Sequence, residues 1–79
     1  MAEDLLGALD GYLALLRQAG RAASTVMRYR SILNVVVERG PAAAFEGELA
    51  PATRLLRYKV VGAFFRWAAA SGYLDSEPV

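Results

Sequence analysis

The nine Arg and Lys side chains are the groups in this sequence whose type and spacing could support chemistry. All nine lie between Arg17 and Arg66, where only three acidic residues accompany them, so this stretch carries a net charge of +6 and both ends of the chain are acidic. Lys59, Gly62 and Arg66 follow one another at i, i+3 and i+7, a spacing that places them on one line of a helix. Guanidinium and ammonium groups arrayed in this way bind phosphates and other anions.

Residue types that the chain lacks exclude most forms of catalysis. The 79 residues include no histidine and no cysteine, which excludes Ser-His-Asp and Cys-His nucleophiles, imidazole acid–base chemistry, His-ligated metals and zinc–thiolate sites. The sequence also shows no acid–base pair and no phosphate-binding loop. We therefore expect a protein that is not an enzyme, with no catalytic residue, cofactor, metal site or small-molecule substrate.

Length and hydropathy indicate a single soluble domain over residues 1–79. The longest stretch without a charge, Trp67 to Leu74, contains eight residues, whereas a helix needs about 20 to cross a bilayer. Glu3 and Asp4 give the N-terminus the opposite charge to that of a signal peptide, and the lack of cysteine suits a reducing compartment. We therefore expect a cytoplasmic protein without a membrane partner.

Fifteen alanines and apolar residues at helical spacing predict an all-α fold, a small bundle of three main helices. The helices are expected over residues 3–18, 23–38 and 51–71. Residues 40–50 are interrupted by glycine and can hold at most a single turn, over 42–45.

Glycine, proline and hydroxyl residues mark the expected helix ends. Gly20, Gly40 and Gly72 follow the three helices as C-terminal stops. Pro51 occupies the first position of the last helix. Ser24 is a possible N-cap of the second helix.

The apolar residues of each helix predict the core. The first two helices are expected to turn one face inward, and the last is apolar almost all the way round, as a central helix would be. The residues expected inside are Leu5, Leu6, Leu9, Tyr12, Leu13 and Leu16 of the first helix, Val26, Tyr29, Leu33, Val36 and Val37 of the second, and Phe64, Phe65 and Trp67 of the last.

Two blocks of the sequence carry the motifs of a known family in the same order. In YLALLRQAGRAASTVMRYRSIL, Thr25, Tyr29 and Leu33 keep a T-x-x-x-Y-x-x-x-L spacing, and RYKVVGAFFRWAAASGYLDSEPV contains F-F-x-W-A, then G-x-L and a final proline. Both blocks resemble the core-binding domain of tyrosine recombinases, the phage-integrase and Xer-type enzymes of DNA integration and DNA recombination. The matching residues of the second block are Phe64, Phe65, Trp67, Ala68, Gly72, Leu74 and Pro78.

This resemblance implies a SAM-like, orthogonal helical bundle that forms half of a clamp on duplex DNA without catalysing any step. Arg and Lys side chains and helix N-termini would bind phosphates, and basic residues along a helix can reach base edges. Arg28 and Arg66 could instead be solvated surface residues, and Arg39 is expected to stabilise a helix C-terminus. The residues favoured for DNA binding are Thr25, Arg28, Arg57, Lys59 and Arg66.

The chain departs from the family's pattern at several positions. Only residues 40–50 stand where the family has a further helix, so we expect that helix to be lost or shortened. Ala22 replaces a serine expected before the second helix, and Leu55 and Gly62 replace residues that are usually basic. The sequence stops at Val79, about where the family's linker to the catalytic domain begins. We therefore expect the catalytic domain, with its nucleophilic tyrosine, to be absent.

A second hypothesis is a helical protein–protein interaction module that is homodimeric through surplus apolar surface. Hydrophobic residues make up 56% of the chain, a high share for so small a domain. Met27, Ile32, Val35 and Leu55 lie on faces that are expected to be exposed. A second copy could cover them, even by exchanging the last helix.

Replacing Arg28 and Lys59 together by Ala is expected to weaken DNA binding, because each cation that neutralises a phosphate releases counterions. The slope of log affinity against log salt should flatten by about 2. A titration of labelled duplex DNA at several salt concentrations measures both quantities. Unchanged binding would show that the interface lies on another face.

Overall fold

Three α-helices and one 3₁₀ turn form the part of the chain that the computed structural model describes, residues 5–73. They are α1 (Leu5–Gln18), α2 (Ala23–Arg39), η1 (Pro41–Phe45) and α3 (Pro51–Ala70). The predicted all-α fold with three main helices is confirmed, and the short turn lies where the sequence allows one. The first turn expected for the first helix, at Glu3 and Asp4, lies outside the described residues, as do Leu74 and Pro78.

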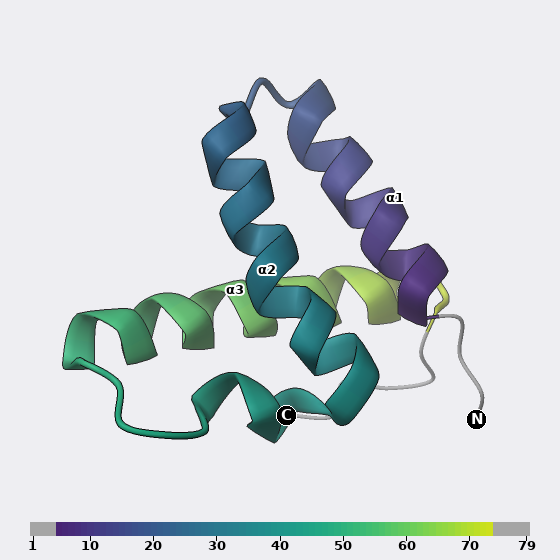
Figure 1. The fold of residues 1–79 in the computed structure, drawn as a ribbon. Helices are drawn as coiled ribbons and strands as arrows, with labels where there is room; N and C mark the ends of the chain where they lie inside the picture. Colours follow the sequence, from purple (N-terminus) through teal and green to yellow (C-terminus); the bar gives the residue numbers. More distant parts are fainter. Residues whose placement is uncertain (1–4, 74–79) are drawn as a thin grey trace.

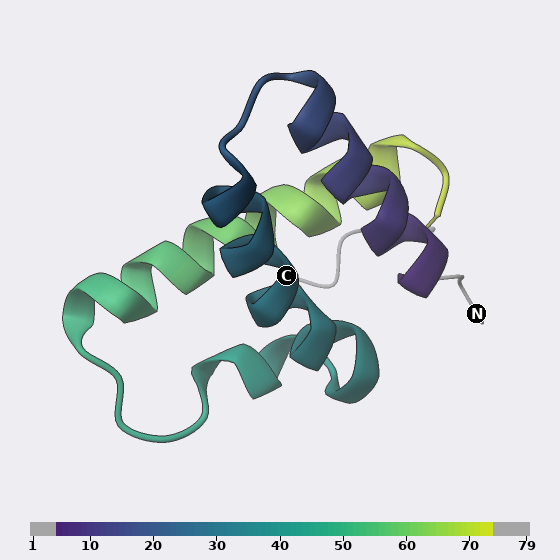
Figure 2. The same ribbon diagram turned by 45° about the horizontal axis from the view of Figure 1, so that its top comes forward.

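The helices are arranged as a pair crossed by a third (Figure 1). α1 and α2 run side by side and are joined by a short turn, and α3 runs across both of them. The same crossing is visible from the second direction of Figure 2, where η1 and the following loop connect α2 to the start of α3. The first half of α3 extends beyond α2 in both views, and none of residues 51–59 is buried.

The core lies where α1 and α2 meet the second half of α3. Phe64 is fully buried, its ring packs at 5.5 Å against the ring of Tyr12, and it lies 5.2 Å from that of Phe65. Trp67 packs between Tyr12 at 5.4 Å and Tyr73 at 5.5 Å, between ring centroids. These edge, tilted and stacked contacts stabilise the core. Burial raises the pKa of the Tyr12 hydroxyl. The prediction that Tyr12, Phe64, Phe65 and Trp67 belong to the core is confirmed.

Exposed apolar residues correct two details of the predicted core. Leu6 was expected inside but is 62% exposed, whereas Ala8 is fully buried. The buried arc of α1 is therefore rotated toward Ala8, and Leu6 falls at its outer edge. Leu55 and Tyr58 of α3 are 55% and 67% exposed, so α3 is a central helix only over its second half.

Glycines with positive φ follow the C-termini of the three helices, and the N-cap residues of α2 and α3 make no side-chain hydrogen bond. Gly20 adopts φ +86°, and beside it the Arg21 N–H donates to the Leu16 carbonyl at 3.1 Å, which closes the C-terminus of α1. Ala22 is the N-cap residue of α2 and its side chain makes no capping hydrogen bond. The prediction of Ser24 as N-cap is therefore wrong, because α2 starts at Ala23 and already includes Ser24. Among the described helices, none is long and apolar enough to cross a membrane.

Replacement of two helical glycines by alanine is expected to change the free energy of unfolding in opposite directions. Gly62→Ala should raise the free energy of unfolding by about 0.5–1 kcal/mol, because glycine weakens a helix and the new β carbon would meet only the movable end of Arg66, at 3.3 Å. Gly11→Ala places a β carbon 3.2 Å from the Trp67 ring. Gly11→Ala should therefore lower the free energy of unfolding by about 1 kcal/mol, because the cost of overpacking exceeds the gain in helix propensity.

Urea denaturation of both variants measures the two changes. The same method applied to the wild-type protein sets the reference. Equal stabilisation by both substitutions would contradict the close approach of α1 to Trp67.

Candidate nucleic-acid interface

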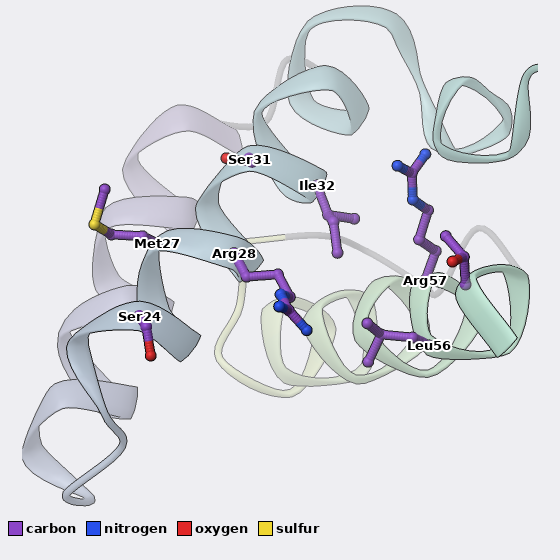
Figure 3. A pocket seen from close by; sticks show the side chains of 8 residues that line it. Ser24, Met27, Arg28, Ser31, Ile32, Leu56 and Arg57 are labelled. Atoms are coloured by element: carbon purple, nitrogen blue, oxygen red, sulfur yellow. The ribbon is translucent and has the colours of Figure 1, made fainter.

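An open groove lies between α2 and the first half of α3 (Figure 3). It exists because this part of α3 extends past the core, so its side chains face α2 across a gap of about 560 Å³. We call it the α2–α3 groove. It is lined by Ser24, Met27, Arg28, Ser31 and Ile32 of α2 and by Thr53, Leu56 and Arg57 of α3.

Arg28 is the exposed cation of the groove on the α2 side. Figure 3 shows its guanidinium extending from α2 toward α3, with Leu56 approaching from the other helix. Thr25 is half-buried and lines an adjoining depression together with Arg28. Two of the five predicted DNA-binding residues are thus brought together at the first turns of α2.

Arg57 faces the same groove from α3 but also has a structural contact. Its Nη1 donates a hydrogen bond to the backbone carbonyl of Ala44 at 3.0 Å, and Figure 3 shows the side chain directed away from Arg28. Ala44 belongs to η1 and is 2% exposed. The guanidinium therefore holds η1 against α3 while it contributes positive charge to the groove.

Lys59 and Arg66 lie on another face of α3. Both are exposed, and they line a depression between α3 and η1 that shares no residue with the α2–α3 groove. Their predicted common line with Gly62 is confirmed, since all three residues line this depression and Arg66 Nη1 lies close to Gly62. The five predicted DNA-binding residues therefore form two groups and not one surface.

The groove also contains three hydroxyl side chains that were not predicted from the sequence as binding residues. Ser24 and Ser31 flank Arg28 on α2, and Thr53 stands one turn before Arg57 on α3. The spacing i, i+4 and i+7 of Ser24, Arg28 and Ser31 was a usable signal. Hydroxyl groups can donate hydrogen bonds to phosphate oxygens, so the groove offers neutral donors beside its two cations.

The charge of the described residues is strongly positive. Residues 5–73 contain nine Arg and Lys against four Asp and Glu, a net charge of +5. Arg39, in the last turn of α2 as predicted, pairs with Glu46 at 2.9 Å, and both side chains are more than half exposed, so this pair adds little stability. The described residues hold no cluster of three or more His, Cys, Asp or Glu that could bind a metal.

Three of the four apolar residues of the homodimer hypothesis line connected depressions along α2, because Ile32 belongs both to the α2–α3 groove and to the depression that contains Val35. Met27 is 68% exposed and Ile32 half-buried in the α2–α3 groove. Val35 is half-buried beside η1, and Leu55 lines a different depression, next to Phe45. Leu55 therefore lies apart from the other three residues of this hypothesis.

Comparison with models of protein families, with curated proteins and with solved structures gave no match to this chain.

Arg57→Met is expected to lower the free energy of unfolding by about 1–2 kcal/mol, because it leaves the Ala44 carbonyl without its hydrogen-bond donor. Thermal melting followed by circular dichroism measures the loss. Arg54→Met, which removes an exposed arginine of the same helix, serves as the control and should change stability by less than about 0.5 kcal/mol. Equal effects of the two substitutions would show that the hydrogen bond does not stabilise the fold.

Proposed function

We propose that this chain is a non-catalytic module that binds duplex DNA through the α2–α3 groove, in the manner of the core-binding part of a tyrosine recombinase. Any strand cleavage would be the work of a separate catalytic domain. The resemblance of two sequence blocks supports the family, and the charge of the groove supports DNA as the ligand.

The observation that carries the proposal is the presence of Arg28 and Arg57, from two different helices, in one open groove. Arginine binds phosphate through paired N–H donors and remains charged at every relevant pH. Cations fixed on two crossing helices would contact successive phosphates along one strand, which fixes the register of the protein on the duplex.

The remaining groove residues suit a sugar–phosphate backbone. Ser24, Ser31 and Thr53 offer hydroxyl donors, and Met27 and Leu56 offer apolar contacts to deoxyribose. α2 also begins without a side-chain cap, so its first N–H groups are not engaged by a capping side chain and suit a phosphate.

Affinity is expected to be modest and dependent on salt. A domain with a few phosphate contacts should bind in the non-specific range, with a Kd of about 10⁻⁴–10⁻⁶ M at physiological salt. Linkage to a catalytic domain or to a second DNA-binding unit would raise the effective concentration and therefore the affinity.

Arg28→Ala is expected to weaken binding to a fluorescein-labelled 20-base-pair duplex and to reduce the salt slope by about 1, because it removes one phosphate contact. Fluorescence anisotropy at several salt concentrations measures both. Arg30→Ala is the matched control, since it removes the same charge from the same helix at an exposed position outside the groove.

The pair of variants separates a localised interface from general attraction. Equal losses for Arg28→Ala and Arg30→Ala would mean that net charge alone attracts DNA, and binding unaffected by Arg28→Ala would refute the groove as the interface. Lys59→Ala, tested singly, shows whether the second basic group contributes.

A further inference from the structure

A continuous trough runs between η1 and α3 on a face that does not belong to the α2–α3 groove. Two depressions of about 500 and 300 Å³ share Phe45 and Tyr58 and so join into one surface, which we call the η1–α3 trough. Figure 1 shows η1 and the first half of α3 on the same side of the bundle, joined by the loop between them. Three apolar side chains, Phe45, Leu55 and Tyr58, line its middle.

The trough exposes apolar groups that the folded chain leaves uncovered. Leu55 is 55% and Tyr58 67% exposed, and Phe45 is half-buried beside them. Single exposed apolar residues are normal on a protein surface, but a contiguous group in a concave site marks a place where another apolar surface is bound.

The rim of the trough is basic. Arg54 borders the first depression, and Lys59 and Arg66 border the second. No Asp or Glu among the described residues lines either depression. Glu46, which follows Phe45, has its carboxylate paired with Arg39 at 2.9 Å. The trough therefore presents cations around an apolar floor.

We propose that the η1–α3 trough binds an acidic amphipathic helix of a partner protein. Apolar side chains at i, i+3, i+4 and i+7 of that helix would pack on Phe45, Leu55 and Tyr58, and its carboxylates would face Arg54, Lys59 and Arg66. The rim runs from Arg54 to Arg66 of α3, twelve steps or about 18 Å at the rise of an α-helix, which corresponds to about three turns of a partner helix.

The basic rim favours an acidic helix over a second copy of the chain and over duplex DNA. A second copy of the chain would bring its own basic rim against the first, so like charges would meet. Duplex DNA would satisfy the cations but would leave Leu55 and Tyr58 against phosphates, without an apolar partner. An acidic amphipathic helix complements both the floor and the rim.

A fluorescein-labelled 14-residue peptide tests the proposal directly. It carries Leu at i, i+3, i+4 and i+7 and Glu at most other positions, and a matched peptide carries Lys in place of every Glu. The wild-type protein should bind the Glu peptide at least tenfold more tightly than the Lys peptide. Leu55→Ser should weaken binding of the Glu peptide at least tenfold, as the loss of a central contact does. Lys59→Gln combined with Arg66→Gln should weaken it severalfold, because two cations of the rim are removed.

Matched variants separate this site from the DNA groove. Arg28→Ala should leave peptide affinity within twofold, and Leu55→Ser should leave DNA affinity within twofold. Circular dichroism melting confirms that each variant is folded, and Tyr58→Ser replaces Leu55→Ser if the latter does not fold. Failure of DNA binding at the α2–α3 groove would therefore leave the proposal for the trough intact.

Three results would overturn the proposal. The first is equal binding of the Glu and Lys peptides, or binding that the trough variants do not weaken. The second is a wild-type dimer in light scattering that Leu55→Ser converts to monomer, which would make a second copy the occupant. The third is loss of DNA binding in the Lys59 and Arg66 double variant as large as in Arg28→Ala, which would assign the trough to DNA.

Discussion

The packing of α1 against the second half of α3 is the interaction on which the rest of the structure depends. Phe64 of α3 lies fully buried at the centre of this contact. The ring of Tyr12 from α1 packs against both Phe64 and Trp67 of α3. Because the buried residues of α3 begin only at Val60, the core covers half of this helix. No residue of its first half, 51–59, is buried.

The uncovered half of α3 gives the molecule two surfaces of different chemistry. Toward α2 it faces a groove that combines Arg28 and hydroxyl groups with three large apolar side chains, which suits a sugar–phosphate backbone. Toward η1 it forms a trough in which Leu55 and Tyr58 lie within a basic rim, which suits an acidic helix. Both surfaces follow from one feature, a helix longer than the core that supports it.

Helical spacing was sufficient to predict the three helices and most of the core, because apolar periodicity and Gly or Pro at the ends are local signals. The N-cap was assigned wrongly, since Ser24 is a good capping type at a position that α2 includes. The Arg57 bond to Ala44 could not be predicted, because it joins residues 13 positions apart through the tertiary fold. For the same reason spacing placed Lys59 and Arg66 on one line but could not show that η1, and not α2, lies beside it.

The bond between Arg57 and Ala44 joins the two surfaces through one side chain. Arg57 lines the α2–α3 groove, and the carbonyl that accepts its hydrogen bond lies in η1 next to Phe45 of the trough. An anion that drew the guanidinium away would loosen η1 and thereby the apolar floor on the other side. Ligands of the two surfaces would then act as mutual antagonists, and linkage requires each to weaken the other by the same factor. Titration of either ligand at fixed concentrations of the other would reveal that reciprocity as equal shifts in Kd.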